Sequence, residues 1–211
     1  MSLFMTGCGL LGLPHVKTIY ELKPAFQGLL RQLVRTLAAH EVTANQVTIA
    51  ACVLSMATGA LIAAIAATRP GVLLLLPVVL FARMALNAID GMLAREHGMR
   101  STRGGYLNEL GDVVSDGALY LPLLVLPGVH AIWVALFVLL AVVAEMAGVI
   151  GAALGGSRRY DGPMGKSDRA FVMGAVGLAI GCGAPGGNWL NVLLVALSAL
   201  LVITIANRVK Q

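Results

Sequence analysis

Two polar stretches, NAIDGMLAR at residues 87–95 and GGYLNELGDVVSD at residues 104–116, stand within an otherwise apolar chain. Residues three or four apart on a helix share a face, so Asn87 and Asp90 would point the same way. The second stretch would align a further ladder of polar side chains: Asn108, Asp112 and Asp116. Because polar groups are costly in apolar surroundings, two such faces predict a functional site.

The composition of the chain indicates a membrane protein. Its 211 residues are 58% hydrophobic and 12% charged, with a mean hydropathy of +0.87. Soluble domains carry about 25% charged residues, so this chain needs the bilayer as the solvent for its apolar surface. The net charge of +5 is modest and aromatic residues make up only 5%, so we expect no nucleic-acid partner. The cysteines Cys8, Cys52 and Cys182 show no metal-ligand spacing.

The N-terminal part of the chain is too polar to span a bilayer. Residues 1–18 are predicted to form an N-terminal tail. The first thirteen of them are weakly apolar and lack the charged start and the cleavage site of a signal peptide. Residues 19–40 carry apolar side chains at steps of three and four: Ile19, Leu22, Phe26, Leu29, Leu33 and Leu37. We expect an amphipathic helix that lies along the membrane surface. The alternative is a helix outside the membrane that packs on the protein's own surface.

Six apolar runs follow the surface helix. They cover residues 45–68, 71–95, 104–126, 131–154, 167–183 and 188–206. A helix of about 20 residues crosses the hydrocarbon core at about 1.5 Å per residue. Thr43 is a plausible N-cap for the first run. The sequence therefore predicts an all-α integral membrane protein, with six transmembrane helices forming one domain over residues 41–211 after the N-terminal amphipathic surface helix.

The basic residues predict how these helices are oriented. All of the 15 Lys and Arg residues except Arg69 and Arg83 lie before residue 40, in the turn 95–103, in the loop 158–169 or at the C-terminus. With six spans, these segments fall on one side, which the positive-inside rule makes cytoplasmic. We expect a protein of the bacterial inner membrane, with both termini and the polar site on the cytoplasmic side.

The residue types at the two stretches suit phosphate and metal chemistry. Carboxylate and amide oxygens that converge can bind a hard divalent cation, and such a cation commonly binds phosphate oxygens. Gly91, Ala94 and Gly104 have almost no side chain, so a ligand or a second helix can approach closely. The alternative is that the polar groups hydrogen-bond among themselves and lock the helices together.

The spacing of the two stretches resembles the signature of the CDP-alcohol phosphotransferases, D-x-x-D-G-x-x-A-R followed after about eight residues by G-x-x-x-D-x-x-x-D. The matching positions are Asn87, Asp90, Gly91, Ala94, Arg95, Gly104, Asn108 and Asp112. Residues 43–48 are similar to the T-P-N-x-x-T motif at the family's first span, with Ala44 in place of proline. Residues 165–169 resemble the G-K-x-x-R motif before its fifth helix.

This resemblance implies a fold and a reaction. The fold is six transmembrane helices behind a surface helix, usually as a homodimer. In the reaction, a CDP-linked lipid such as CDP-diacylglycerol donates its phosphatidyl group to an alcohol and CMP leaves, with Mg²⁺ or Mn²⁺ on the pyrophosphate.

The resemblance also implies roles for individual residues. Asp112 would be the general base. The CDP moiety would contact Asn45, Thr48, Asp90, Gly91, Ala94, Arg95 and Gly104. The metal ligands would be Asn87, Asp90, Asn108 and Asp112.

Two of the four signature acids are amides in this chain, at Asn87 and Asn108. An amide offers one neutral carbonyl oxygen, so it cannot bridge two cations as a carboxylate can. Asp116 or Glu109 could restore some of the lost charge. Three outcomes stay open: a one-metal enzyme, an enzyme of altered chemistry, and a catalytically degenerate CDP-lipid-binding protein that acts as a partner or regulator. A small transporter is a further alternative, although no inverted repeat is visible.

A basic cluster beside the predicted site suits an anionic acceptor. It comprises Arg158, Arg159, Lys166 and Arg169. The resemblance of residues 165–169 to family members that accept phosphorylated polyols implies an acceptor such as an inositol or glycerol phosphate, and arginine side chains suit phosphate because they bind it through paired hydrogen bonds. A loop that is basic only because it faces the cytoplasm would look similar. Arg83 and Glu145 are predicted to be buried, either as an ion pair with each other or in contact with substrate.

Overall fold

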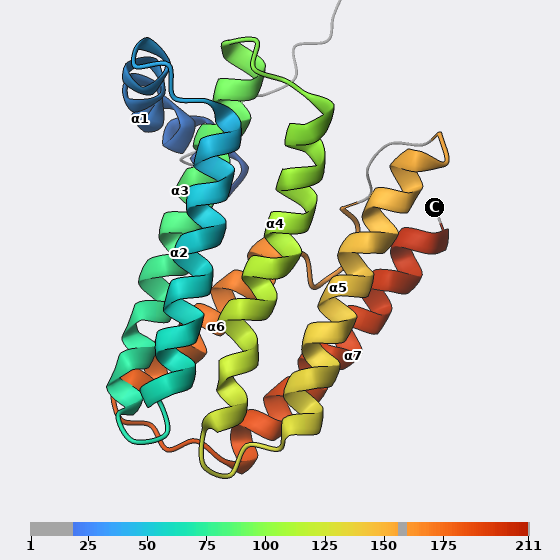
Figure 1. The fold of residues 1–211 in the computed structure, drawn as a ribbon. Helices are drawn as coiled ribbons and strands as arrows, with labels where there is room; N and C mark the ends of the chain where they lie inside the picture. The colour runs from blue at the N-terminus through green and yellow to red at the C-terminus, as the bar shows by residue number, and fades with distance from the viewer. Residues whose placement is uncertain (1–18, 156–159, 211) are drawn as a thin grey trace, which may run out of the picture.

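The computed structural model describes residues 19–155 and 160–210, and every regular element in them is helical. The elements follow in this order: α1 (Ile19–Ala39), α2 (Ala44–Ile65), η1 (Pro70–Leu74), α3 (Leu75–Glu96), α4 (Thr102–Tyr120), η2 (Leu121–Val125), α5 (Ala131–Ala153), α6 (Lys166–Gly181) and α7 (Asn188–Lys210). Figure 1 shows the long helices side by side in one bundle, with α1 across one end. The predicted tail, residues 1–18, lies outside the described residues.

The predicted apolar runs correspond to helices, and side-chain caps fix where α2 and α4 begin. Thr43 caps α2: its Oγ1 accepts from the backbone N–H of Gln46, and the Gln46 side chain accepts from the Thr43 N–H at 2.8 Å. This reciprocal capping satisfies two N–H groups that the first turn leaves unpaired. Ser101 caps α4 through a single bond of this kind, with Oγ accepting from the N–H of Gly104 at 2.9 Å. The all-α prediction is therefore confirmed.

Four helical segments are long and apolar enough to cross a membrane: Ala44–Ile65, Pro70–Glu96, Ala131–Ala153 and Asn188–Lys210. The remaining two predicted spans differ from these for visible reasons. Helix α4 carries the polar ladder of the second stretch, and α6 has only 16 residues. The protein is an integral membrane protein, while the count of six spans stays a prediction.

Helix α1 packs on α3 through Leu37 of the predicted apolar face together with Val34, which the sequence periodicity did not single out. Val34 is fully buried there, and it lies in one apolar cluster with Ile89 and Leu93 of α3. Leu29 and Leu33, which belong to the predicted apolar face, are exposed. The helix thus has two apolar edges, one held by the protein and one free to meet lipid. Its position along the membrane surface remains a prediction.

The bundle is held by close helix pairs. Helix α2 packs against α3 and α4, α5 packs against α7, and α6 packs against α3. At the crossing of α2 and α4, a Cβ added to Gly59 would overlap the carbonyl of Ala118. Glycine therefore sets the distance between these two helices. The main buried cluster includes Phe137, Tyr120 and Leu194.

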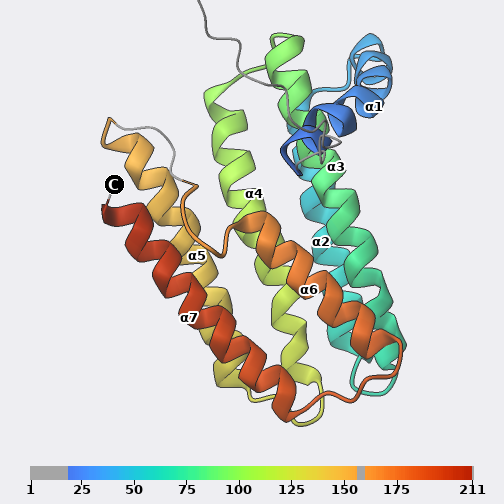
Figure 2. The same cartoon turned by 180° about the vertical axis from the view of Figure 1, so that it is seen from behind.

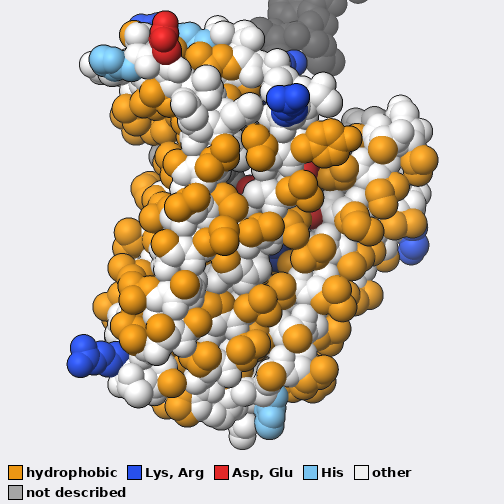
Figure 3. Space-filling model, in the orientation of Figure 1, with side chains coloured by type: hydrophobic (Ala, Val, Ile, Leu, Met, Phe, Trp, Pro, Cys, Tyr) orange, Lys and Arg blue, Asp and Glu red, His pale blue; other side chains and the backbone are white. Residues whose placement is uncertain are grey.

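The surface of the bundle suits a bilayer. Large apolar side chains are exposed along several helices, among them Val78, Leu139, Phe171 and Val192. Figure 3 shows orange side chains over the whole height of one face, with some charged atoms in a recess between the helices. Exposed apolar area of this extent is typical of contact with lipid.

The segment before α6 enters the bundle, as Figure 2 shows for the chain between α5 and α6. Met164 is buried, and its N–H donates to Thr204 Oγ1 of α7 at 3.0 Å. Gly162 has φ 124° and lies so close to Thr204 that a Cβ would come within 2.6 Å of its Cα. Lys166, the first residue of α6, is in this way brought beside α4.

Candidate active site

Thr48 and Asp90 join the first two long helices at the polar site. Thr48 Oγ1 donates to Asp90 Oδ2 at 2.7 Å, and both side chains are buried. The predicted nucleotide residue on α2 therefore meets the predicted metal ligand on α3. The short bond fixes the orientation of the Asp90 carboxylate within an apolar bundle, where a polar group without a partner would be costly.

Asp112, the predicted base, receives donors from two helices. Its Oδ1 accepts from Asn87 Nδ2 at 3.2 Å and from Arg83 Nη2 at 3.4 Å, both on α3. The Lys166 ammonium of α6 forms an ion pair with the same oxygen. A carboxylate can only accept, so Asn87 must present its nitrogen to Asp112 and not its oxygen.

A buried chain of ion pairs continues from this point. Asp116 Oδ1 accepts from Arg83 Nη1 at 2.8 Å, and Asp116 Oδ2 accepts from Arg169 Nη2 at 3.0 Å. Arg169 Nη2 also donates to Glu145 Oε1 at 3.0 Å, and Arg208 Nη1 lies 3.7 Å from that oxygen. These contacts connect helices α3 to α7 through their least exposed charged groups.

Several of these contacts were not anticipated. The sequence placed Arg83 one turn from Asn87 but suggested Glu145 as its partner, whereas its described ion pairs are with Asp112 and Asp116. Arg83 and Glu145 are connected through Asp116 and Arg169. The meeting of Lys166 with Asp112 was also missed, because spacing along the chain does not show which helices become neighbours.

A polar cavity of about 660 Å³ lies between α2, α3 and α4. Each residue predicted to contact the CDP moiety lines it: Asn45, Thr48, Asp90, Gly91, Ala94, Arg95 and Gly104. Two predicted metal ligands, Asn87 and Asn108, line it as well. A Cβ on Gly104 would come within 2.7 Å of Asn45 Oδ1, so glycine keeps this wall open. The structure thus gathers these positions around one space.

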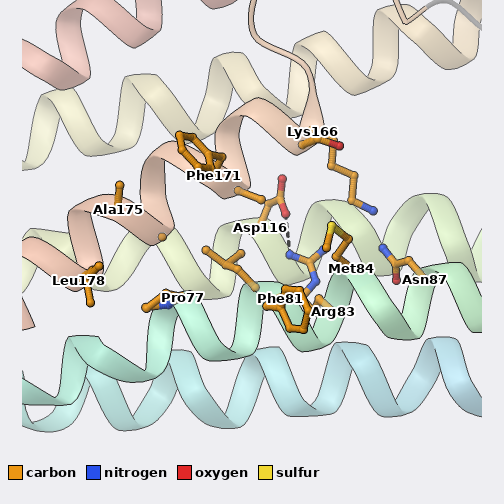
Figure 4. A pocket seen from close by; sticks show the side chains of 14 residues that line it. Pro77, Phe81, Arg83, Met84, Asn87, Asp116, Lys166, Phe171, Ala175 and Leu178 are labelled. Atoms are coloured by element: carbon orange, nitrogen blue, oxygen red, sulfur yellow. Dashed lines mark hydrogen bonds and ion pairs between the residues drawn. The ribbon is translucent and has the colours of Figure 1, made fainter. Parts of the chain in front are cut away.

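A second cavity, of about 590 Å³, is an apolar groove between α3 and α6. Figure 4 shows Pro77, Phe81, Phe171 and Leu178 along it, with Lys166 and Asn87 at its polar end. Asn87 lines both this groove and the polar cavity. A polar space and an apolar groove therefore meet at one signature residue.

The residues predicted to bind the acceptor have different positions. Arg158 and Arg159 lie outside the described residues. Lys166 lines the polar end of the groove and is about one-third exposed, at 31% of its side chain. Arg169 is only 1% exposed and pairs with Asp116 and Glu145.

The donor atoms at the signature positions fit one hard cation better than two. Within residues 19–155 and 160–210, no cluster of three or more His, Cys, Asp or Glu side chains is placed to hold a metal. The signature supplies two carboxylates, Asp90 and Asp112, and two amides, Asn87 and Asn108. Asp112 already pairs with Lys166 through one oxygen. A single cation bound by Asp90, Asp112 and amide oxygens is compatible with this set.

Known proteins share both the sequence and the fold of this chain. The inner membrane protein YnbA of Escherichia coli strain K12 is 47% identical over 194 residues, which is 92% of this chain and 96% of the relative. The phosphatidylinositol phosphate synthase of Mycobacterium tuberculosis has the same fold at 24% identity. Its complex with manganese and citrate gives a TM-score of 0.68 over 85% of this chain and 86% of that one. Its structure with CDP-DAG bound gives 0.69 over 85% and 90%.

A family model described as CDP-alcohol phosphatidyltransferase matches residues 41–206, which include both polar stretches and all the helices from α2 to most of α7. This match extends the short signature to nearly the whole membrane domain. The chain belongs to the CDP-alcohol phosphatidyltransferase family.

Proposed function

We propose that this protein is a membrane transferase that moves a phosphatidyl group, or a related phospholipid group, from a CDP-linked lipid to an alcohol and releases CMP. The observation that carries the proposal is the meeting of the polar cavity with the apolar groove at Asn87. CDP-diacylglycerol has a polar nucleotide and two apolar chains, so it needs both kinds of space. The synthase with the same fold has been solved with CDP-DAG bound.

The chemistry assigns one step to Asp112. Its carboxylate takes the proton of the acceptor hydroxyl while the acceptor oxygen bonds to the lipid-side phosphorus, and the bond from that phosphorus to the CMP oxygen breaks. Arg83 and Lys166 hold Asp112 in place through their ion pairs. A divalent cation, Mg²⁺ or Mn²⁺, bound by Asp90, Asp112 and amide oxygens of Asn87 and Asn108, would neutralise charge on the pyrophosphate.

The acceptor that we propose is a phosphorylated polyol. The support is Lys166, a cation at the polar end of the groove. Arg169 supports the proposal less directly, since its guanidinium is shared between Asp116 and Glu145. We also propose that the protein forms a homodimer in the bacterial inner membrane. The name of the E. coli relative, an inner membrane protein, supports the location. Cross-linking in native membranes would show whether the dimer exists.

The experiment measures CMP release by the purified protein from CDP-diacylglycerol with Mg²⁺ or Mn²⁺. Free polyols and their phosphates are compared as acceptors. We expect release with a polyol phosphate, and a loss of at least about 100-fold in Asp112→Asn, because general base catalysis contributes about 10²–10⁴. Glu96→Gln, at the exposed end of α3, is the control and should keep full activity.

The second candidate function is a catalytically degenerate CDP-lipid-binding protein that acts as a partner or regulator. The amides at Asn87 and Asn108 favour it, because they remove two charges from the signature. The same experiment separates the two functions. If the protein binds the CDP-lipid but releases no CMP with any acceptor, the transferase proposal is wrong and the second function stands.

A further inference from the structure

The buried ion pairs leave part of one guanidinium unsatisfied. Arg169 is 1% exposed, and its Nη2 donates to both Asp116 and Glu145. Its Nε and Nη1 are buried and have no hydrogen-bond partner among the described residues. The hydroxyl of Tyr120, a fully buried side chain, has no partner among them either. Buried polar atoms are nearly always hydrogen-bonded, so these three atoms indicate a bound ligand that the side chains do not supply.

Both side chains line one small cavity between α4, α5 and α6. Its volume is about 10 Å³, and Asp116 and Glu145 line it together with apolar residues of α4 and α5. A space of this size holds about one water molecule. We propose that this cavity is a binding site for a single buried water molecule, which bridges Arg169 and Tyr120.

The charges around the cavity favour water over an ion. An anion would be repelled by the carboxylates of Asp116 and Glu145, and a cation would be repelled by the guanidinium of Arg169. The cavity is also too small for an acceptor alcohol or a phosphate group. A water oxygen can accept hydrogen bonds from Arg169 and Tyr120, while its hydrogens donate to a carboxylate. Water is therefore the ligand that satisfies donors and acceptors at once.

The bound water gives Arg169 a structural role close to the predicted base. Arg169 pairs with Asp116, which pairs with Arg83, and Arg83 in turn pairs with Asp112. By satisfying the remaining N–H groups of Arg169, the water stabilises the guanidinium in the position that these contacts need. The inference goes beyond the proposed transferase reaction and does not depend on it, because the cavity and its donors belong to the bundle itself.

X-ray radiolytic footprinting tests the inference on the full-length protein in detergent micelles without substrate. X-rays produce hydroxyl radicals from water, and radicals from a bound water oxidise the side chains that contact it. Tyr120 and Phe137 are a matched pair: both are fully buried and their ring centroids are 5.8 Å apart, but Phe137 does not line the cavity. Mass spectrometry should show Tyr120 oxidised at least about threefold faster than Phe137, because Tyr120 contacts the water.

Two variants of α5 separate a bound water from the intrinsic reactivity of tyrosine. Ala141→Val fills the cavity that Ala141 lines, so oxidation of Tyr120 should fall to the rate of Phe137. Ala135→Val makes the same change at an exposed position and should leave oxidation of Tyr120 as in the unmodified protein. Equally slow oxidation of Tyr120 and Phe137 in the unmodified protein, or unchanged oxidation in folded Ala141→Val, would overturn the inference.

A second measurement needs no variant and so remains decisive if Ala141→Val does not fold. The protein is mixed with isotope-labelled water just before exposure to X-rays. Oxidised Tyr106, whose side chain is exposed, should carry the label at once. Tyr120 should carry it only after a delay, because a water held inside the bundle exchanges slowly with the solvent. Immediate labelling of both tyrosines would show that Tyr120 reacts with bulk solvent, which would contradict a buried water site.

Discussion

Asp116 is a buried carboxylate that forms ion pairs with two buried arginines. It accepts hydrogen bonds from Arg83 of α3 and from Arg169 of α6. Asp116→Asn keeps the shape but removes the charge, which leaves two buried guanidiniums short of a partner. Loss of one member of a buried ion pair costs about 3–5 kcal/mol, so we expect a fall of several degrees in the thermal unfolding midpoint in detergent.

The matched control for this prediction is an ion pair at the surface. Glu96 pairs with Arg31 at 3.2 Å, but the two side chains are 39% and 49% exposed. Glu96→Gln should therefore change stability by less than about 1 kcal/mol. Equal midpoints for Asp116→Asn and Glu96→Gln would show that the buried network does not stabilise the bundle.

Spacing along the chain predicted which residues would share a face, but not which faces would meet. Asn87 and Asp90 both line the polar cavity, as positions three apart on one helix should. The pairing of Lys166 with Asp112 depends on how α6 is rotated against α4, and periodicity within one helix carries no information on that rotation. The partners of Arg83 were missed for the same reason.

At the level of the elements, the apolar runs located the helices well because lipid contact demands long uncharged segments. The first run was predicted at 45–68, and α2 extends over Ala44–Ile65. The segment before α6 could not be predicted in this way. Its burial depends on single contacts, such as Met164 with Thr204, that leave no periodic pattern in the sequence.

The crossing of α2 and α4 gives a prediction for one element pair. Gly59→Ala would place a Cβ against the Ala118 carbonyl, so the helices would have to separate. Overpacking of this kind costs about 1–3 kcal/mol. Gly117→Ala is the matched control, since a Cβ there meets nothing within 4 Å and alanine favours a helix. Thermal unfolding should show Gly59→Ala less stable than the parent and Gly117→Ala equal or more stable. The opposite order would contradict the close crossing.

The whole molecule has two chemically different ends, and this difference predicts its orientation in the membrane. The turn between α3 and α4 lies at the same end of the bundle as α1, and the turn between α2 and η1 lies at the opposite end (Figure 1). Arg100 lies in the first of these turns, and Arg95 and Arg103 lie in the helix ends on either side of it, whereas the second turn contains Arg69. The positive-inside rule therefore predicts that the polar cavity lies on the cytoplasmic side.

Single cysteines test this orientation in intact cells. In a variant without Cys8, Cys52 and Cys182, a membrane-impermeant maleimide should label Thr68→Cys, because that exposed position is predicted to face the periplasm. It should label Arg103→Cys, at the exposed start of α4, only after the cells are permeabilised, since that position is predicted to face the cytoplasm. Labelling in detergent shows that both thiols can react. The reverse pattern would place the polar cavity on the periplasmic side, away from a cytoplasmic supply of nucleotide-linked lipid, and would contradict the proposed reaction together with the orientation.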